Sequence, residues 1–293
     1  SADDRELAAI GRIHTWKQFL DTYRAARKAG FENINVDIMS ALPGQTLAGY
    51  RQTLERILSL EPPPEHISAY SLILEEGTPL FERYEEGSLD IPDEDTDRGM
   101  YELTQEILAE RGYRRYEISN YAREGYECRH NCGYWRRRSY LGFGLGAASL
   151  VDNVRFRNGA DLRAYLADPL GCREEEQILS RQEQMEEFMF LGLRMRSGIS
   201  CGEFRQLFGQ GIEEIYGDVI DKNIRDGLLE LWPEGEGAGE SLRRPGGRED
   251  RGYMSAQDGQ DRRHERGHVR TGRLALTEKG LDLSNYVMAQ FLL

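Results

Sequence analysis

The first 120 residues alternate helix-like and strand-like patterns, and this alternation constrains the fold more than any other feature of the sequence. Thr15 and Gln18 have the spacing of a helix capping box, and apolar residues then recur at helical intervals as far as Gly30. A helix is therefore predicted over residues 15–29. Residues 33–39 contain two isoleucines and a valine and precede a Leu-Pro-Gly breaker, which predicts a strand followed by a loop.

A second helix and a second strand follow the same pattern. Apolar residues between Leu47 and Ile57 predict a helix that ends before three consecutive prolines, and residues 66–73 predict a strand. A further helix is expected over residues 94–111 and a short strand over 115–119. Strands that are separated by helices pair in parallel, so we expect an α/β fold with a parallel sheet, either open or barrel-like. The strands are too few to close a barrel.

Helices dominate the C-terminal half. They are expected over residues 181–195, 201–208 and 219–231. A strand is expected over residues 273–276, followed by a helix that Thr277 caps. Residues 233–270 include eight glycines and 16 charged side chains, so they cannot offset the entropy of ordering, and a disordered insertion is predicted there. Helices followed by a strand that a long loop interrupts are typical of a winged-helix-like module.

The composition argues against several functional classes. The chain has 38 Lys and Arg against 51 Asp and Glu, and this net charge of −13 is a poor basis for binding nucleic acid phosphates. No apolar run approaches the roughly 18 residues of a membrane span, and the first residues are not signal-like. A cytoplasmic protein is therefore expected, with peripheral membrane association left open. Four cysteines are too few for a disulfide-built fold.

Asp37 is the first candidate site residue. Side chains alternate between the faces of a strand, so Val36 and Ile38 share one face and Asn35 and Asp37 share the other. Because helices cover the apolar face of such a strand, Asp37 is expected to point into a barrel or a cleft, where its carboxylate can accept hydrogen bonds from sugar hydroxyls. The alternative is that Asp37 caps the loop that follows the strand.

A short segment near residue 130 concentrates an imidazole, two thiols and two aromatic rings. Cys128, His130 and Cys132 could supply metal ligands, although a structural zinc site needs a second pair of ligands that the sequence does not show. His130 could instead be an axial ligand of haem iron, with Tyr134 and Trp135 beside the macrocycle. The third alternative is a structural turn with a buried aromatic pair and a hydrogen-bonded histidine.

The glycines at positions 142, 144 and 146 form another candidate ligand segment. They let the backbone approach a ligand closely, but no clear strand and helix flank them, so they are a weak dinucleotide-binding fingerprint. The alternating Phe143 and Leu145 favour a buried strand whose glycines make room for a neighbour.

Several motifs of this sequence occur together, and in the same order, in one known family. The chain resembles the radical S-adenosylmethionine (SAM) haem chaperones, also described as oxygen-independent coproporphyrinogen III oxidase-like proteins. The likeness covers nearly the whole chain except residues 233–270. The matching segments are Gly-Arg-Ile-His at 11–14, Asn-Val-Asp-Ile-Met-Ser-Ala-Leu-Pro-Gly-Gln-Thr at 35–46, His-Ile-Ser-Ala-Tyr-Ser-Leu at 66–72, Tyr-Glu-Ile-Ser-Asn-Tyr-Ala at 116–122 and His-Asn-x-x-Tyr-Trp at 130–135.

The chain departs from the family at the iron–sulfur cluster. The family binds a 4Fe–4S cluster through a Cys-x3-Cys-x2-Cys loop after its first strand, and this chain has no such loop. Cys128 and Cys132 have the first spacing, but Trp135 stands where the third cysteine would be, so this segment cannot be the radical-generating site. Residue 1 aligns just past the family's fourth strand, and we therefore expect a fragment that lacks the N-terminal part of a full-length relative.

The resemblance implies two domains. Residues 1–125 would form the back part of a partial radical SAM barrel. Residues 126–293 would form a mostly α, winged-helix-like C-terminal domain of the haem-chaperone and coproporphyrinogen-oxidase type, which contains the disordered insertion.

The resemblance also assigns roles to single residues. Arg12 would pair with the carboxylate of SAM, and Asp37 would contact the polar groups of SAM. The other implied SAM-lining residues are Ser71, Gly146 and Ala148. The implied haem-binding residues are His130, Tyr134 and Trp135, with His130 as the ligand of the iron.

The leading hypothesis is a haem-binding chaperone of the radical SAM superfamily that delivers haem to respiratory proteins and, in this form, cannot cleave SAM. The alternative is an oxygen-independent coproporphyrinogen III oxidase, which would make the chain part of a tetrapyrrole-synthesis enzyme. Only the His-Asn-x-x-Tyr-Trp segment favours the haem chaperone over the oxidase. The expected ligands are SAM and either haem or a porphyrinogen, with the 4Fe–4S cluster in the full-length relative only. Nucleic acid binding by the C-terminal module is disfavoured, because its predicted helix near Lys222 is rich in acidic residues.

Overall fold

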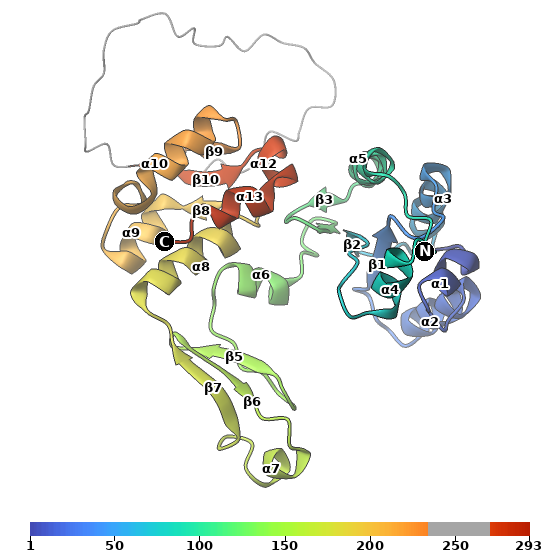
Figure 1. Cartoon of the computed structure of the whole chain (residues 1–293), viewed down its shortest axis with the longest axis horizontal. Helices are drawn as coiled ribbons and strands as arrows, with labels where there is room; N and C mark the ends of the chain where they lie inside the picture. The colour runs from blue at the N-terminus through green and yellow to red at the C-terminus, as the bar shows by residue number, and fades with distance from the viewer. Residues whose placement is uncertain (234–269) are drawn as a thin grey trace, which may run out of the picture. The chain divides into compact units, whose positions relative to one another are not determined.

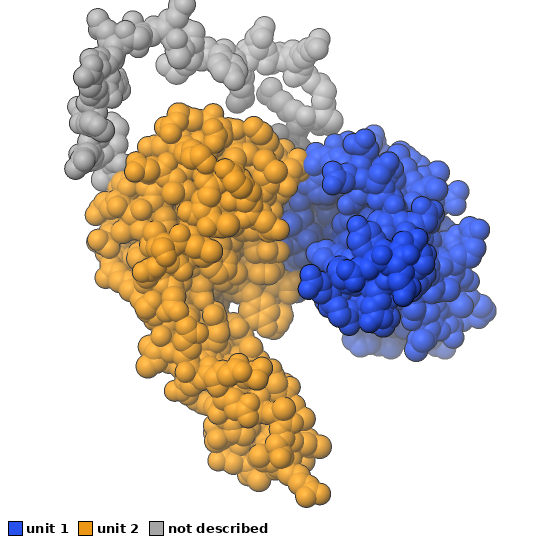
Figure 2. Space-filling model, in the orientation of Figure 1, with its two compact units in different colours: residues 1–128 blue, residues 129–293 orange. Residues whose placement is uncertain are grey.

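The computed structural model describes residues 1–233 and 270–293, which form two compact units (Figure 1). Unit 1 contains residues 1–128 and unit 2 contains residues 129–293 (Figure 2). Each unit has its own sheets and its own buried core, so each is described by itself.

Unit 1 is built on a four-stranded sheet with the order β1-β2-β4-β3. β1 (Asn35–Ser40) and β2 (His66–Ser71) pair in parallel, and α3 (Leu47–Leu58) connects them. Both strands and the helix were predicted from the alternating patterns. The apolar face of β1 is also as predicted, because Val36 and Ile38 are buried while Asp37 is exposed.

The other half of this sheet is antiparallel, and the predicted parallel sheet is wrong there. β4 (Asn120–Ala122) pairs antiparallel with β2, and β3 (Arg114–Arg115) pairs antiparallel with β4. The strand expected over residues 115–119 is mostly the connection between β3 and β4. A connection this short can only join antiparallel neighbours, because a parallel pair needs a crossover of a dozen or more residues.

Three longer helices pack with the sheet to form the core of unit 1. α2 (Trp16–Lys28) begins at the predicted capping box, in which Thr15 and Gln18 bond each other's backbone N–H groups. α5 (Glu94–Glu110) contacts α3, β1 and β2. Fully burying a side chain such as Leu54 stabilises the fold by about 1.5–3 kcal/mol. Two short helices that the sequence patterns did not predict complete the unit: α1 (Asp4–Ala9) and α4 (Pro79–Glu85).

Unit 2 begins with α6 (Arg129–Trp135) and continues into a three-stranded antiparallel sheet that projects from the rest of this unit (Figure 1). Its strands are β5 (Ala148–Val151), β6 (Val154–Asn158) and β7 (Arg173–Ile178), with α7 (Leu162–Ala167) between the last two. The buried strand favoured for the glycine-rich segment is wrong. Phe143 is 81% exposed and Leu145 is 43% exposed, and regular strand structure begins only at Ala148.

The rest of unit 2 is helical with a small antiparallel sheet. Its helices are α8 (Arg181–Gly192), α9 (Cys201–Phe208), α10 (Ile212–Arg225), α12 (Glu278–Asp282) and α13 (Ser284–Ala289). Its sheet has the order β8-β10-β9, formed by β8 (Ile199–Ser200), β10 (Arg273–Leu276) and β9 (Leu229–Trp232). This is the predicted winged-helix-like outline, with the strand over residues 273–276 at its centre.

The predicted helix over residues 219–231 is wrong at both ends. α10 begins at Ile212 and ends at Arg225, because Gly227 has a positive φ of 70° and turns the chain into β9. The disordered insertion predicted over residues 233–270 lies outside the described residues, except for its first and last positions. Among the described residues, no helix is both long and apolar enough to cross a membrane.

Candidate functional site

The polar face of β1 and β2 carries a hydrogen-bonded cluster that includes Asp37. The Asn35 amide donates to the Asp37 carboxylate at 2.7 Å. The His66 ring bonds the Asn35 side-chain oxygen at 2.7 Å and the Tyr116 hydroxyl at 2.8 Å. Burial lowers the pKa of His66, although Glu117 and Asp37 act in the opposite direction. The sequence argument found Asp37 but not this network, because its partners lie on three separate segments.

Ser71 and Arg12 lie apart from Asp37. In the register of β1 and β2, Asp37 is opposite Ser68 whereas Ser71 is opposite Ser40, so Ser71 is on the other face of the sheet. Its hydroxyl bonds both carboxylate oxygens of Asp97 at 2.8 Å. Arg12 is exposed in the loop after α1. The structure therefore does not bring these three predicted SAM residues onto one face, and their roles stay predictions.

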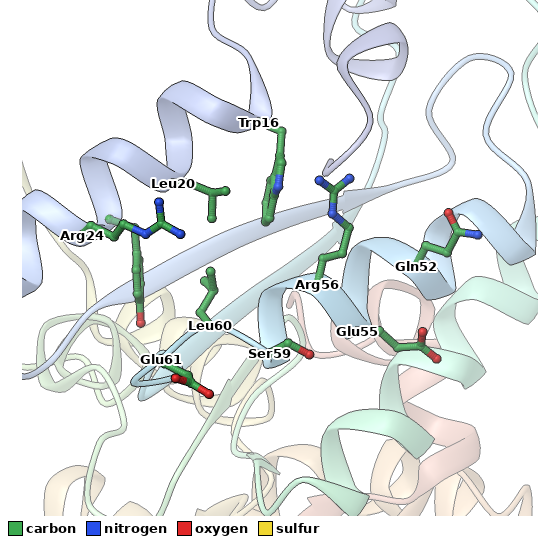
Figure 3. Close-up of a pocket in the computed structure, with 10 residues that line it drawn as sticks. Trp16, Leu20, Arg24, Gln52, Glu55, Arg56, Ser59, Leu60 and Glu61 are labelled. Carbon is green, nitrogen blue, oxygen red and sulfur yellow. The ribbon is translucent and has the colours of Figure 1, made fainter.

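A cavity of about 840 Å³ opens between α2 and α3 in unit 1 (Figure 3). Figure 3 shows Trp16 and Arg56 side by side between the two helices, and the guanidinium lies 4.5 Å from the ring centroid. Arg24 and Arg56 are balanced by Glu55 and Glu61 within the same lining. None of the predicted site residues lines this cavity.

A second cavity, of about 690 Å³, lies within unit 2 beside α6. His130 and Tyr134 are four residues apart, so they lie on one face of the helix, and their rings meet edge to face at 4.5 Å. Tyr140 continues the row at 4.6 Å from Tyr134. His130, Tyr134 and the third predicted haem residue, Trp135, all line the cavity. The structure therefore brings the three predicted haem residues to one hollow.

The glycine-rich loop forms another wall of this cavity. A side chain at Gly142 would place its Cβ 2.3 Å from the carbonyl oxygen of Ala148, so only glycine fits where the loop meets β5. The Asn158 amide donates to the carbonyl oxygens of Gly142 at 3.2 Å and Gly144 at 2.8 Å. Ala148 lines this cavity together with the haem residues, whereas Gly146 has a positive φ of 66° and is not part of the lining. Their implied contact with SAM stays a prediction.

An ion cluster centred on the buried Glu187 holds two arginines of the cavity lining. Glu187 on α8 accepts from Arg137 at 2.7 Å and from Arg155 at 2.6 Å, each on a different carboxylate oxygen. Arg137 also donates to the side-chain oxygen of Asn153 at 2.9 Å. Asn153 is the second residue of the two-residue turn between β5 and β6, and both turn residues have a positive φ, as type I′ hairpins require. The sequence argument missed this cluster because Glu187 lies 50 residues from Arg137.

Trp135 is held on the other side by a cation. The Arg194 guanidinium lies 4.3 Å from the ring centroid of Trp135. The indole N–H of Trp135 is buried and finds no acceptor among the described residues. The ring is therefore fixed by stacking rather than by a hydrogen bond.

The cysteines do not fit an iron–sulfur cluster. Cys132 and Cys201 are buried, and Cys128 and Cys172 are partly exposed. In residues 1–233 and 270–293, no three or more His, Cys, Asp or Glu side chains lie together as a metal site would require. Among these residues, Cys128, His130 and Cys132 therefore do not form the ligand group that the zinc alternative requires.

Comparisons with known proteins identify similar sequences. The chain is 36% identical to the haem chaperone HemW of Lactococcus lactis over 98% of this chain and 65% of the relative, and 35% identical to HemW of Bacillus subtilis over 78% of this chain and 60% of the relative. These relatives and the matching domain family support a radical SAM family of the HemW/HemN type for this chain. The predicted family is thereby confirmed. The HemN C-terminal domain family matches residues 179–235.

A solved structure shows the same fold. Coproporphyrinogen III oxidase (HemN) from Escherichia coli, described as a radical SAM enzyme, aligns with a TM-score of 0.69 at 16% identity, over 99% of this chain and 62% of that chain. The predicted fold class, part of a radical SAM barrel followed by a C-terminal domain, is confirmed by this match. The chain spans less than two thirds of the length of the HemW relatives and of HemN.

Proposed function

We propose that this chain binds haem in the cavity of unit 2 and acts as a haem chaperone. The observation that carries the proposal is that His130, Tyr134 and Trp135 all line one cavity of about 690 Å³. This volume is within the usual range of ligand pockets, about 300–1,000 Å³, which are mostly apolar with a few placed polar groups. The relatives named as haem chaperones support the same function.

Each part of the lining suits one part of haem. The imidazole of His130 is exposed, so a ring nitrogen can reach the iron as an axial ligand. The aromatic rings of Tyr134 and Tyr140 offer apolar faces and edges to a flat macrocycle. Phe143 is 81% exposed on the rim of the cavity, and a bound macrocycle would cover part of this ring.

SAM is the second ligand of this proposal. In unit 1, Arg12 and Asp37 would contact SAM, with Ser71 held by Asp97 near the end of β2. SAM would supply radical chemistry only with a 4Fe–4S cluster, for which these cysteines offer no ligand set. We assign haem binding and transfer to this chain, with haem-accepting respiratory proteins as its partners.

Haem titration of the purified full chain tests the proposal. Removing the imidazole in His130→Ala should shift the Soret band and weaken binding, because the iron loses its protein ligand. His14→Ala is the matched control, since His14 lies in unit 1 and does not line the cavity. Identical spectra and affinities for the unaltered chain and His130→Ala would remove this histidine from the site.

A further inference from the structure

The lining of the unit 2 cavity carries an excess of positive charge. Its lining includes Arg137, Arg138 and Arg155 and no aspartate or glutamate. Glu187, which is not part of the lining, pairs with Arg137 and Arg155. Three guanidinium groups against one carboxylate leave two positive charges beside an apolar hollow, which is an arrangement that attracts anionic groups.

The three arginines are not equivalent. The side chain of Arg137 is 12% exposed, and Glu187 and Asn153 both hold it, so it is a structural support. Arg155 is 41% exposed and uses one nitrogen on Glu187, which leaves other N–H groups of its guanidinium for a ligand. Arg138 is exposed, and no ion pair to it is found among the described residues.

We propose, on the basis of the proposed haem function, that Arg138 and Arg155 bind the carboxylates of a flat macrocycle that carries two of them. Guanidinium groups suit this role because their planar N–H pairs match the geometry of a carboxylate. Glu187 is a positioning residue that fixes the direction of Arg155. The two surplus positive charges match the two propionates of haem.

The same charge count separates haem from a macrocycle with four carboxylates. Two further carboxylates would find no further cation in the lining, which also includes the apolar side chains of Leu141, Phe143 and Leu191. Leaving ionised groups against an apolar wall is unfavourable. The site is therefore specific for a dicarboxylate, and coproporphyrinogen, with four, is the poorer ligand.

Binding to the full chain of haemin, haemin dimethyl ester and iron coproporphyrin III tests this specificity. Arg138→Ala should weaken haemin roughly tenfold, the loss of one charge-assisted contact, and should change the affinity for the uncharged ester less than about twofold. Arg136→Ala is the matched control, because Arg136 is exposed next to the cavity but does not line it, and it should leave both affinities unchanged. Iron coproporphyrin III should bind no more tightly than haemin.

The outcomes separate this inference from the proposed function. Equal losses for haemin and its ester in Arg138→Ala, or tighter binding of iron coproporphyrin III than of haemin by the unaltered chain, would overturn the inference alone. Absence of any haemin binding by the unaltered chain would overturn the proposed function and the inference with it.

Discussion

The two cavities differ in the balance of charge in their linings. The cavity of unit 1 is the larger, at about 840 Å³, yet its arginines are matched by glutamates in the same lining and Arg56 is stacked on Trp16. The cavity of unit 2, at about 690 Å³, has arginines without acidic neighbours in its lining and an exposed phenylalanine on its rim. An excess of cations in a largely apolar lining indicates an anionic ligand better than volume does.

The largest expected effect comes from removing the Glu187 carboxylate, which pairs with two arginines of the unit 2 cavity lining. Glu187→Ala leaves Arg137 buried without its ion pair and should lower the free energy of unfolding by about 3–5 kcal/mol. Chemical denaturation measures this change. Glu176→Ala, at an exposed position in β7, is the control and should leave the free energy of unfolding almost unchanged. A small loss for Glu187→Ala would mean that water already reaches the cluster.

A smaller effect is expected in the glycine-rich wall. Gly142→Ala would force its new methyl group against the carbonyl of Ala148, so the loop must move, at about 1–3 kcal/mol, and haem should bind more weakly. The control is Gly133→Ala in α6, where a Cβ meets nothing within 4 Å and alanine favours the helix. Thermal unfolding and haem titration of both variants check this. Equal behaviour would show that the loop does not shape the cavity.

The polar cluster of unit 1 should give a pH dependence. Because burial lowers the pKa of His66, the unfolded chain takes up a proton below its ordinary pKa of 6.5 more readily than the folded chain does. The contribution of His66 to the free energy of unfolding is fully present above pH 6.5. It should fall as the pH drops below 6.5, by at most about 1.4 kcal/mol per pH unit. His66→Gln should flatten this slope in denaturation curves, whereas His14→Gln should keep it. An unchanged slope in His66→Gln would assign the dependence to other groups.

The smallest effect is expected in the unit 1 cavity. Arg56→Ala removes the stack on Trp16 and should cost about 0.5–1 kcal/mol of stability at this exposed site. Haem affinity should not change, because the cavity proposed to bind haem lies in unit 2. A weaker affinity for haem in Arg56→Ala would contradict the assignment of function to only one of the two cavities.

Local signals in the sequence predicted the elements that carry such signals. The capping box at Thr15 predicted the start of α2, and the apolar residues of β10 predicted that strand. β7 was missed because all of its residues are exposed, so no alternation of apolar and polar residues marks it. The end of α10 was misplaced because the hydrophobic pattern continues through the turn at Gly227 into β9.

The candidate site was predictable to the extent that its residues are neighbours in the chain. His130, Tyr134 and Trp135 share one short helix, so one motif located them. Glu187 and Arg155 come from elements far along the chain, and only tertiary packing brings them together. Ser71 shows the opposite case, because its place at a strand end was foreseen but the register turned it away from Asp37.

Asn153 has two separate tasks. Its backbone forms the hairpin turn between β5 and β6, and its side chain holds Arg137. Glycine adopts the same turn without a side chain. Asn153→Gly would therefore keep the shape of the hairpin and remove the hydrogen bond to the Arg137 guanidinium. A substitution at this turn can therefore change how the Arg137 guanidinium is held beside the cavity, while the strands of the hairpin stay in place.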